Sequence, residues 1–323
     1  MAQAESYNVV NNREDLTDLL TTVAPEETPI LSGMPKTKAQ SATLMEWTTD
    51  NYENVDFVGI QEGVDQTTHK DKTALRKRIG NRYQIFRNSY SVTDVQQAVS
   101  TAGVPNEEAN SKAKALVEMK RSMESAIGSD NDLVAGSGLV PSQMRGLGAW
   151  VNASTSTLDA AIRTPAASIG TTSGLTESGF NDVLQSVYES AGQVQDMRLY
   201  AGSALQRGIS DFTRAEGSVT PTPFQVNSDQ SSREIIFSVQ FYRGDFANVQ
   251  IVSDLFLGRT TGTGIDTTSK ERGYLLTDAM VNVSMWQAPE IFEQTDEGGG
   301  PRGFAHARGT LMVKNPLGLG KFA

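Results

Sequence analysis

The sequence predicts an α+β fold in which helices and strands alternate without a regular βαβ period. Three observations carry this prediction. Residues 105–128 have the apolar spacing of one long amphipathic helix, and residues 176–192 have that of a second. Short strand-like segments such as residues 82–100 lie before and after these helices at irregular intervals. No internal repeat is found in the sequence.

Length and composition exclude several classes of protein. The 323 residues, 38% of them hydrophobic, suit one large domain or two ordinary ones. No stretch approaches the roughly 20 apolar residues of a membrane-spanning helix, and no signal peptide is recognisable, so we expect a protein made and used in the cytosol or released by lysis. The lack of cysteine excludes disulfides and thiolate chemistry. A net charge of -10 argues against a general nucleic-acid binder and fits soluble subunits that repel one another.

The first fifty residues form an arm with little to bury. Their first part has the spacing of a short helix whose apolar stripe consists of Leu16, Leu19, Leu20 and Val23. Pro25 ends this helix. Pro29 and Pro35 are expected to hold the next residues extended, because proline fixes its own φ and disfavours helix at the preceding residue.

Charge is segregated along the segment that follows. The first limb carries only acids and the second carries bases with one acid, Asp71. The acids are Glu46, Asp50, Glu53, Asp56, Glu62 and Asp65, and the bases are Lys70, Lys72, Arg76, Lys77, Arg78 and Arg82. If the turn lies in EGVDQTTHKDK, the limbs form a long hairpin whose cross-strand neighbours have opposite charge. Such a hairpin has too few apolar residues to stand alone, so we expect it to lie on another surface of its own chain or of a neighbour.

The basic limb, residues 70–82, has three possible uses. It could bind phosphate groups of nucleic acid, although only Tyr83 and Phe86 are adjacent aromatics. It could form a charge-complementary contact with the acidic limb or with a neighbouring subunit, which is the interpretation we favour. A lysine of this limb could also form an isopeptide bond with an asparagine of another subunit, for example Asn315, although no specific motif supports this.

The longest predicted helix covers residues 105–128. Pro105 stands at its start, Glu107 and Glu108 occupy its first turn, and Gly128 ends it. Its apolar stripe consists of Ala109, Ala113, Leu116, Met119, Met123 and Ile127. On the other face we expect pairs of opposite charge at i, i+4, namely Lys114 with Glu118 and Lys120 with Glu124.

The rest of the chain predicts a mixture of loops, strands and helices. Residues 131–175 are rich in small residues and are predicted to be loops around the apolar island LGAWV. Residues 197–212 predict a strand, a turn and a short helix, and residues 233–257 predict two or three strands. Another strand is predicted at 274–286, and a turn with a final strand in GGGPRGFAHARGTLMVKNP. We interpret LGLGKFA at the C-terminus as a flexible turn.

No catalytic, metal-binding or cofactor-binding site is predicted. His69 and His306 both lie in polar loop contexts, without the spacing of a metal site or a catalytic constellation. Asp130 and Asp132 resemble the first two ligands of a calcium loop, but the later positions lack the required residues, so we interpret both as part of a helix-ending turn. GTGID, from Gly262, lacks the third glycine of a dinucleotide fingerprint.

The order of these segments resembles that of the major head proteins of tailed double-stranded DNA bacteriophages. The resemblance rests on the arm REDLTDLLTTVAPEETPILSGMPKTKA, the strand around EW, the return strand RYQIF with SVTDVQQAV, and the helix NEEANSKAKALVEMKRSMESAI. It continues through FNDVLQSVYESAG, LYAGSALQRGISDF, FANVQIVSDLFL and ARGTLMVKNP, and so covers nearly the whole chain in order. The implied fold is the Hong Kong 97 type.

Carried onto this sequence, the resemblance implies a set of domain ranges. Residues 1–42 resemble the N-arm, 43–90 the extended loop and its root, 91–133 the peripheral domain with a spine helix at 105–128, 134–299 mainly the axial domain, and 300–323 the C-terminal strand of the peripheral domain.

The function that the resemblance implies is structural and not enzymatic. Copies of the chain would assemble as hexamers and pentamers into an icosahedral virion head enclosing double-stranded DNA, built in the cytoplasm of a host bacterium. Its partners would be other copies of itself, a portal protein at one vertex and, where a phage of this type uses them, separate scaffold and decoration proteins. Contacts with packaged DNA would be weak and confined to the inner surface, and no cofactor or membrane is implied.

Two other interpretations of the sequence remain open. The Gly- and Thr-rich segments would also suit a phage tail or fibre component or a carbohydrate-binding surface module. An ordinary hydrolase is disfavoured because no nucleophile and base are found together. If the protein is a capsid protein, we hypothesise that the arm and the charged loop make contacts between subunits. The residues expected in these contacts are Leu16, Leu19, Leu20, Trp47, Glu53, Asp56, Glu62, Lys70, Lys72, Arg76, Lys77, Arg78 and Arg82.

Overall fold

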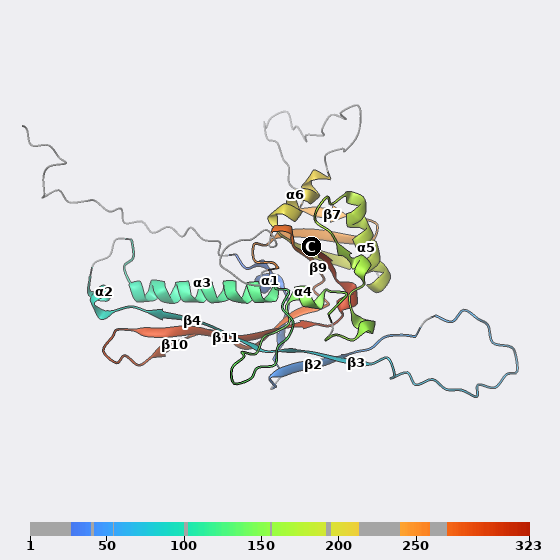
Figure 1. Ribbon diagram of the computed structural model, residues 1–323, viewed down its shortest axis with the longest axis horizontal. Coiled ribbons are helices and arrows are strands. Elements are labelled where there is room, and N and C mark those ends of the chain that lie inside the picture. Colours follow the sequence, from blue (N-terminus) through green and yellow to red (C-terminus); the bar gives the residue numbers. More distant parts are fainter. Residues whose placement is uncertain are drawn as a thin grey trace, which may run out of the picture.

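The structure is a computed structural model. It describes residues 27–39, 42–53, 55–99, 103–155, 157–191, 195–212, 240–258 and 270–323. Within these residues the chain forms two β-sheets, each with its own helices, and a long hairpin that extends away from both (Figure 1). The arrangement mixes helices with parallel and antiparallel strands, as the α+β prediction requires.

The first sheet has four strands in the order β1-β10-β11-β4. They are β1 (Lys36–Lys38), β10 (Val281–Gln294), β11 (Arg302–Val313) and β4 (Gln84–Ser91). β10, β11 and β4 pair antiparallel, and β1 pairs parallel with β10. The strand predicted within residues 82–100 is confirmed as β4, whose alternation buries Phe86 and Tyr90.

Helix α3 (Glu107–Ile127) lies along one face of this sheet (Figure 1). It begins at Asn106, whose side chain accepts a hydrogen bond from the amide of Ala109 at 3.0 Å, and it ends at Gly128. Its buried apolar residues recur every fourth position and pack against the sheet in one core. They are Ala115, Met119, Met123 and Ile127. The predicted long helix is therefore confirmed.

Two details of the α3 prediction are wrong. Ala109 and Ala113 are exposed, because the buried stripe continues toward the helix start through Lys112 and Glu108. These two side chains form an ion pair at 2.6 Å, and the Lys112 ammonium lies over the Tyr90 ring in place of apolar packing. Glu124 was expected on the charged outer face, but it is completely buried.

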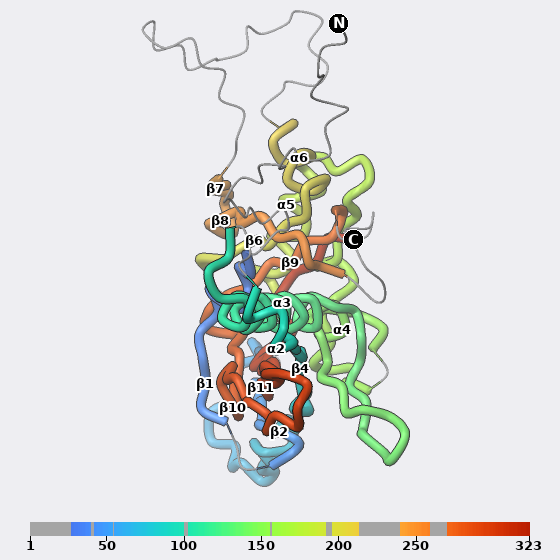
Figure 2. The backbone as a smooth tube through the Cα atoms, turned by 90° about the vertical axis from the view of Figure 1, so that its left-hand side faces the viewer, coloured from blue at the N-terminus to red at the C-terminus, as the bar shows by residue number. Residues whose placement is uncertain are grey.

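The second sheet has six strands in the order β5-β12-β9-β6-β8-β7. They are β5 (Ile169–Gly170), β12 (Gly320–Phe322), β9 (Gly273–Leu276), β6 (Gln195–Ala201), β8 (Ala247–Ser253) and β7 (Phe241–Arg243). β6 lies between β8, which runs parallel to it, and β9, which runs antiparallel. In Figure 2 this sheet and the four-stranded sheet lie on opposite sides of α3.

Helices α5 (Glu177–Ala191) and α6 (Ser203–Asp211) cover the six-stranded sheet and share its core. The Thr176 hydroxyl accepts a hydrogen bond from the amide of Gly179 at 3.1 Å at the start of α5. The phenyl ring of Phe180 stacks on that of Phe322 in β12, with centroids 5.3 Å apart. The strand, turn and helix predicted for residues 197–212 are confirmed as β6, Gly202 and α6.

Several short elements connect these layers. β2 (Leu44–Thr49) and β3 (Lys77–Arg82) form the root of the hairpin, and α2 (Asp94–Ala98) precedes α3. The island LGAWV contains α4 (Leu147–Trp150), all of whose side chains are buried. The described part of the chain also contains three 3-10 turns, η2 (Ala160–Ile162), η3 (Ala166–Ser168) and η4 (Pro316–Gly318).

The described end of the arm packs on its own chain, and Pro29 begins a helix instead of keeping the chain extended. Proline fits the first position of a helix because its missing N–H has no partner there. This helix is α1 (Pro29–Gly33), in which Ile30 and Leu31 are buried. β1 follows directly and pairs with β10, so Lys36 lies opposite Val283.

Two predictions for the C-terminal part are also wrong. LGLGKFA was interpreted as a flexible turn, but it ends in β12, a buried strand that pairs with both β5 and β9. His306 was placed in a polar loop, yet it lies on β11 and is buried. Both segments are too short or too polar for their periodicity to reveal a strand whose burial comes from distant neighbours.

Strand pairing connects the expected domain ranges at two places. β10 falls within 134–299, the range expected to be mainly axial, but it pairs with β1 and β11 in the four-stranded sheet. β12 falls within 300–323, the range expected to be peripheral, but it lies in the six-stranded sheet. The chain therefore crosses between the two sheets more often than a simple succession of domains would require.

Candidate functional site

The root of the hairpin is anchored in its own chain by Trp47. This side chain is half-buried on β2, opposite Ile79 of β3. Its ring lies 5.7 Å from that of Trp150 in α4, and its indole nitrogen donates a hydrogen bond to the carbonyl oxygen of Val313 at 3.1 Å. The structure thus places Trp47 in contacts within the chain, which hold the base of the hairpin against the core.

Beyond this root, the two limbs are connected by ion pairs across the hairpin. Arg76 contacts Asp50 at 2.8 Å, and Glu53 accepts from Lys70 at 3.2 Å and from Lys72 at 3.1 Å. Closer to the body, Arg78 pairs with Glu46, and Lys77 pairs with Asp159 at 3.0 Å. The expectation that the limbs set opposite charges against each other is confirmed within a single chain.

These pairs shift the titration of the loop carboxyls. The hydrogen bond from Arg76 holds the pKa of Asp50 below its ordinary value, and those from Lys72 and then Lys70 do the same for Glu53. Asp50 in turn raises the pKa of Arg76. All of these groups are exposed, so solvent and salt screen their attraction, and the pairs shape the loop more than they stabilise the fold.

The far part of the loop has no partner in the described residues for its apolar side chains. Six of them are more than half exposed, namely Tyr52, Val55, Phe57, Val58, Ile60 and Val64. We call these six residues the apolar loop cluster. Phe57 is 93% exposed, which is unusual for a phenylalanine in an isolated soluble chain. Such a surface indicates a contact with another molecule.

The remaining predicted contact residues differ in their surroundings. Among the described residues, Asp56 and Glu62 form no ion pair, although Asp56 accepts a hydrogen bond from the amide of Val58 at 3.0 Å. Arg82 is half-buried, and its Nε has no hydrogen-bond partner there. The predicted helix with Leu16, Leu19 and Leu20 lies outside the described residues. Asn315, the isopeptide candidate, accepts a hydrogen bond from the amide of Leu317.

A buried polar network that the sequence did not predict joins the end of α3 to the six-stranded sheet. Asp130 pairs with Lys321 of β12 at 2.9 Å and with Arg272, and it accepts a hydrogen bond from the Tyr274 hydroxyl at 3.3 Å. Gly148 is needed beside it, because a Cβ there would lie 1.6 Å from an Asp130 oxygen. The signal that could have revealed this network is the lone Lys321 within an apolar C-terminus.

Burial and charge oppose each other in this network. Burial lowers the pKa of the Lys321 ammonium, and the Asp130 charge acts in the opposite direction. Burial also raises the pKa of the Tyr274 hydroxyl far above its ordinary range. Asp132, which the sequence also assigned to the turn at the end of the helix, pairs with the buried guanidinium of Arg145 at 2.5 Å. Both aspartates therefore serve as structural counter-ions.

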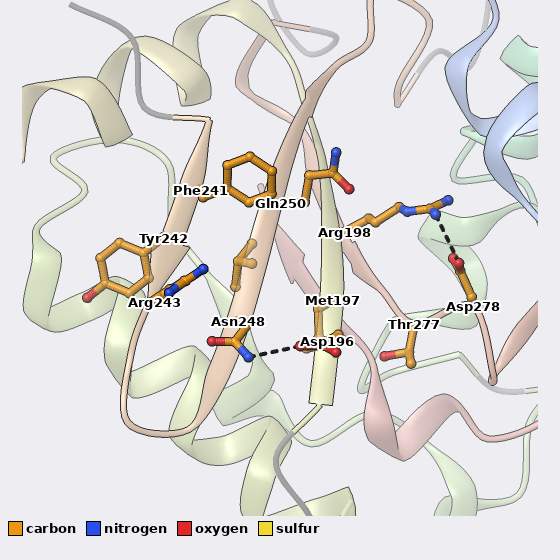
Figure 3. Close-up of a pocket in the computed structure, with 11 residues that line it drawn as sticks. Asp196, Met197, Arg198, Phe241, Tyr242, Arg243, Asn248, Gln250, Thr277 and Asp278 are labelled. Carbon is orange, nitrogen blue, oxygen red and sulfur yellow. Dashed lines mark hydrogen bonds and ion pairs between the residues drawn. The ribbon is translucent and has the colours of Figure 1, made fainter.

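A shallow groove of about 540 Å³ lies on the face of the six-stranded sheet opposite its helices, and Figure 3 shows its lining. Two contacts cross it: Asn248 donates to Asp196 at 2.9 Å, and Arg198 pairs with Asp278 at 3.1 Å. No cluster of three or more potential metal ligands occurs in the part of the chain that the structure describes. In the same part, no helix is long and apolar enough to cross a membrane.

The geometry is that of a protein with an interaction surface: an anchored hairpin whose charges are paired and whose apolar side chains are exposed. Residues 3–323 match the SU10 major capsid protein family. The chain belongs to this family. As a major capsid protein of tailed phages, it assembles with copies of itself into the icosahedral shell of the virion. This finding favours the head protein over the tail, fibre or carbohydrate-binding alternatives.

The fold of this major capsid protein is similar to that of solved phage capsids. The TM-score is 0.61 to a chain of the mature capsid of bacteriophage PhiM1, at 10% identity over 99% of this chain and 94% of the other. It is 0.60 to the capsid of cyanophage P-SCSP1u, at 10% identity over 100% and 98%. It is 0.52 to Mycobacterium phage Che8, at 14% identity over 97% and 98%. The Hong Kong 97 type fold is thereby confirmed. No curated protein sequence matches the chain.

Proposed function

We propose that copies of this capsid protein form hexamers and pentamers in which the hairpin of each copy lies across a neighbouring copy. The exposure of the apolar loop cluster is the observation that carries this proposal. Removing one square ångström of apolar surface from water stabilises a complex by about 25 cal/mol. Burying the six side chains of the apolar loop cluster against another molecule is therefore strongly favourable. In a symmetric shell, every copy has a neighbouring copy whose surface can cover its apolar loop cluster.

The ion pairs within the hairpin indicate that its inner and outer parts have different roles. Glu46, Asp50 and Glu53 already have basic partners in their own chain. Asp56 and Glu62 lie further out, beside the apolar loop cluster, and form no ion pair among the described residues, so they are available to a basic neighbour. We therefore assign the intersubunit charge contacts first to Asp56 and Glu62, and give the basic limb the role of holding the loop extended.

The domain ranges and remaining partners are part of the same proposal. Residues 1–42 act as the N-arm and 43–90 as the extended loop, while β10 joins the peripheral domain and β12 the axial domain. The shell encloses double-stranded DNA, which touches the inner surface only weakly, and it is assembled in the host cytoplasm. A portal protein occupies one vertex, and scaffold or decoration proteins, where used, are separate chains. The protein acts without catalysis.

A pair of double variants tests the loop contact. Phe57→Ser with Ile60→Ser removes two side chains of the apolar loop cluster. Leu139→Ser with Val140→Ser removes two exposed apolar side chains from a different loop and serves as the control. We expect folded subunits from both, closed shells from the control, and few or no shells from the loop variant in negative-stain microscopy. Normal shells from the Phe57 and Ile60 variant would overturn the proposal.

A further inference from the structure

Two carboxyl groups meet in the interior where α1, α3 and the end of β8 come together. Glu124 lies on the buried face of α3 with none of its surface exposed, and Asp254 directly follows β8 and is 2% exposed. The carboxyl of Asp254 lies within hydrogen-bonding reach of the carboxyl of Glu124. Two adjacent buried carboxylates repel strongly, and a hydrogen bond between them requires a proton on one. The pair therefore shares one proton.

Glu124 is the member of the pair that suits the negative charge. One of its oxygens accepts a hydrogen bond from the amide of Ile30 at 2.6 Å, and the other accepts from the amide of Leu31 at 2.8 Å. These amides are at the start of α1, where Thr28 provides no side-chain cap. Because amide groups at a helix start favour a negative partner, the carboxylate of Glu124 holds α1 against α3.

Asp254 is correspondingly the member that suits the proton, and it belongs to the other sheet. Its amide donates to the carbonyl oxygen of Ala201 in β6 at 3.0 Å, and its side chain accepts from the amide of Phe256 at 2.8 Å. Glu124, in contrast, is carried by α3, which packs on the four-stranded sheet. The hydrogen bond between the two carboxyls is thus a connection between the two sheets.

We propose that Glu124 and Asp254 form a proton-operated latch between the two sheets. With one proton bound, the latch is closed by a hydrogen bond between the two carboxyls. When that proton leaves to solvent, two negative charges face each other at the seam, and the six-stranded sheet moves relative to α3. Glu124 keeps its two amide donors in either state, so α1 stays docked while the contact with Asp254 opens.

Burial is the main cause that raises the pKa of Glu124 to about 8, and the Asp254 charge adds to it. Because the two carboxyls share one proton, this pKa describes the loss of that proton from the pair, whichever carboxyl carries it. The α1 amides act in the opposite direction but do not cancel it. The latch is therefore closed at neutral pH and opens in mildly alkaline solution. The Asp130 network next to it pairs buried charges of opposite sign, so the two sheets are expected to change their angle without coming apart.

Other charged and titratable groups surround the pair. From β6, Tyr200 is near enough for the Glu124 charge to act on its hydroxyl, and Arg198 beside it is bound to Asp278 and to the carbonyl oxygen of Gly33. From β9, Tyr274 is near enough for the Asp254 charge to act on its hydroxyl. On α3 itself, the Arg121 guanidinium lies over the Phe256 ring, 5.6 Å from its centre. The surrounding tyrosines have pKa values raised by burial, so they stay neutral while the pair titrates.

The chain has no cysteine, so two spin labels can report the angle between the sheets in the full-length protein. Lys120→Cys on α3 and Asp182→Cys on α5 place labels at exposed positions on either side of the seam. We expect the label-to-label distance to shift with a midpoint near pH 8 as the pH is raised. No shift between about pH 6 and about pH 10 would overturn the latch.

Asp254→Asn is the decisive variant because it imitates the protonated state. Its amide oxygen keeps the Phe256 contact, and its amide nitrogen donates to Glu124 at every pH. We expect it to abolish the distance shift, whereas Asp278→Asn, which also removes a nearby negative charge, retains it. An unchanged shift in Asp254→Asn would overturn the proposal.

An infrared measurement keeps the proposal testable if Asp254→Asn does not fold. The unaltered protein should show a carboxylic acid band at about pH 7 that disappears by about pH 10, because ordinary carboxyls are ionised throughout this range. The absence of this band at neutral pH would overturn the shared proton and with it the latch.

Discussion

The indole nitrogen of Trp47 donates a hydrogen bond to the carbonyl oxygen of Val313, 266 positions further along the chain. This contact ties the start of the hairpin to the end of β11, next to the point where the chain passes from one sheet to the other. A hairpin anchored in this way can project its apolar loop cluster outward in a defined direction. Rigid anchoring at the root lowers the entropy that a neighbouring copy must remove when it binds the loop.

The first prediction concerns this anchor. Trp47→Phe keeps an aromatic ring against Trp150 but removes the N–H donor. We expect the free energy of unfolding to fall by about 1 kcal/mol, the typical contribution of one hydrogen bond. Trp286→Phe, at a more exposed tryptophan, should cost less than about 0.5 kcal/mol. Chemical denaturation of both variants measures the difference, and equal losses would contradict the anchoring role.

The second prediction separates charge contacts within the chain from contacts between subunits. Arg78→Glu sets like charges against each other, because Arg78 pairs with Glu46. We expect this variant to give fewer shells in negative-stain microscopy, and the double variant with Glu46→Arg to recover them. If the double variant assembles no better than the single one, the main partner of Arg78 lies on a neighbouring subunit, as the sequence-based hypothesis supposed.

The third prediction concerns the Asp130 network. Asp130→Asn leaves the buried ammonium of Lys321 and the partly buried guanidinium of Arg272 without their counter-ion, which should cost roughly 3 kcal/mol or more of stability. Lys321→Met removes one cation and fills a similar volume, while Arg272 keeps its pairing, so the loss should be clearly smaller. Denaturant titrations compare the two. A larger loss for Lys321→Met than for Asp130→Asn would show that Lys321 stabilises the fold by more than its charge pairing with Asp130.

The fourth prediction is a pH dependence of stability. The pKa of Glu124 rises from an ordinary 4.5 to about 8 on folding, so the folded protein holds the proton more tightly than the unfolded chain. The free energy of unfolding should therefore fall as pH increases between these values and level off above about pH 8. Asp254→Asn should flatten this slope in denaturant titrations across the range.

His306 must be considered in the same measurement because it acts with the opposite sign. Burial, and then Arg308 and Arg87, lower its pKa from an ordinary 6.5. Its contribution to stability is therefore lost on acidification and is fully present above about pH 6.5. The comparison with Asp254→Asn removes this background, since His306 is unchanged in both proteins. A slope that is equal in the two proteins would rule out the Glu124 contribution.

Much of the architecture followed from patterns within short windows of sequence. The spacing of Met119, Met123 and Ile127 predicted the long helix, and the alternation around Phe86 and Tyr90 predicted the adjacent strand. The opposite charges of the two limbs predicted that they would face each other. In each case the information is local, because helix and strand geometry repeat every few residues and place alternate side chains on opposite faces.

The α+β class, the positions of the main helices and strands, and, through the order of its segments, the capsid family could all be predicted from the amino-acid sequence. The burial of Glu124 against Asp254, the docked helix that begins at Pro29, and the strand that places Lys321 beside Asp130 became evident only in the folded chain. These outcomes depend on partners that are distant in sequence. Local periodicity carries no information about such partners, and burial turns an ordinary surface charge into a structural element.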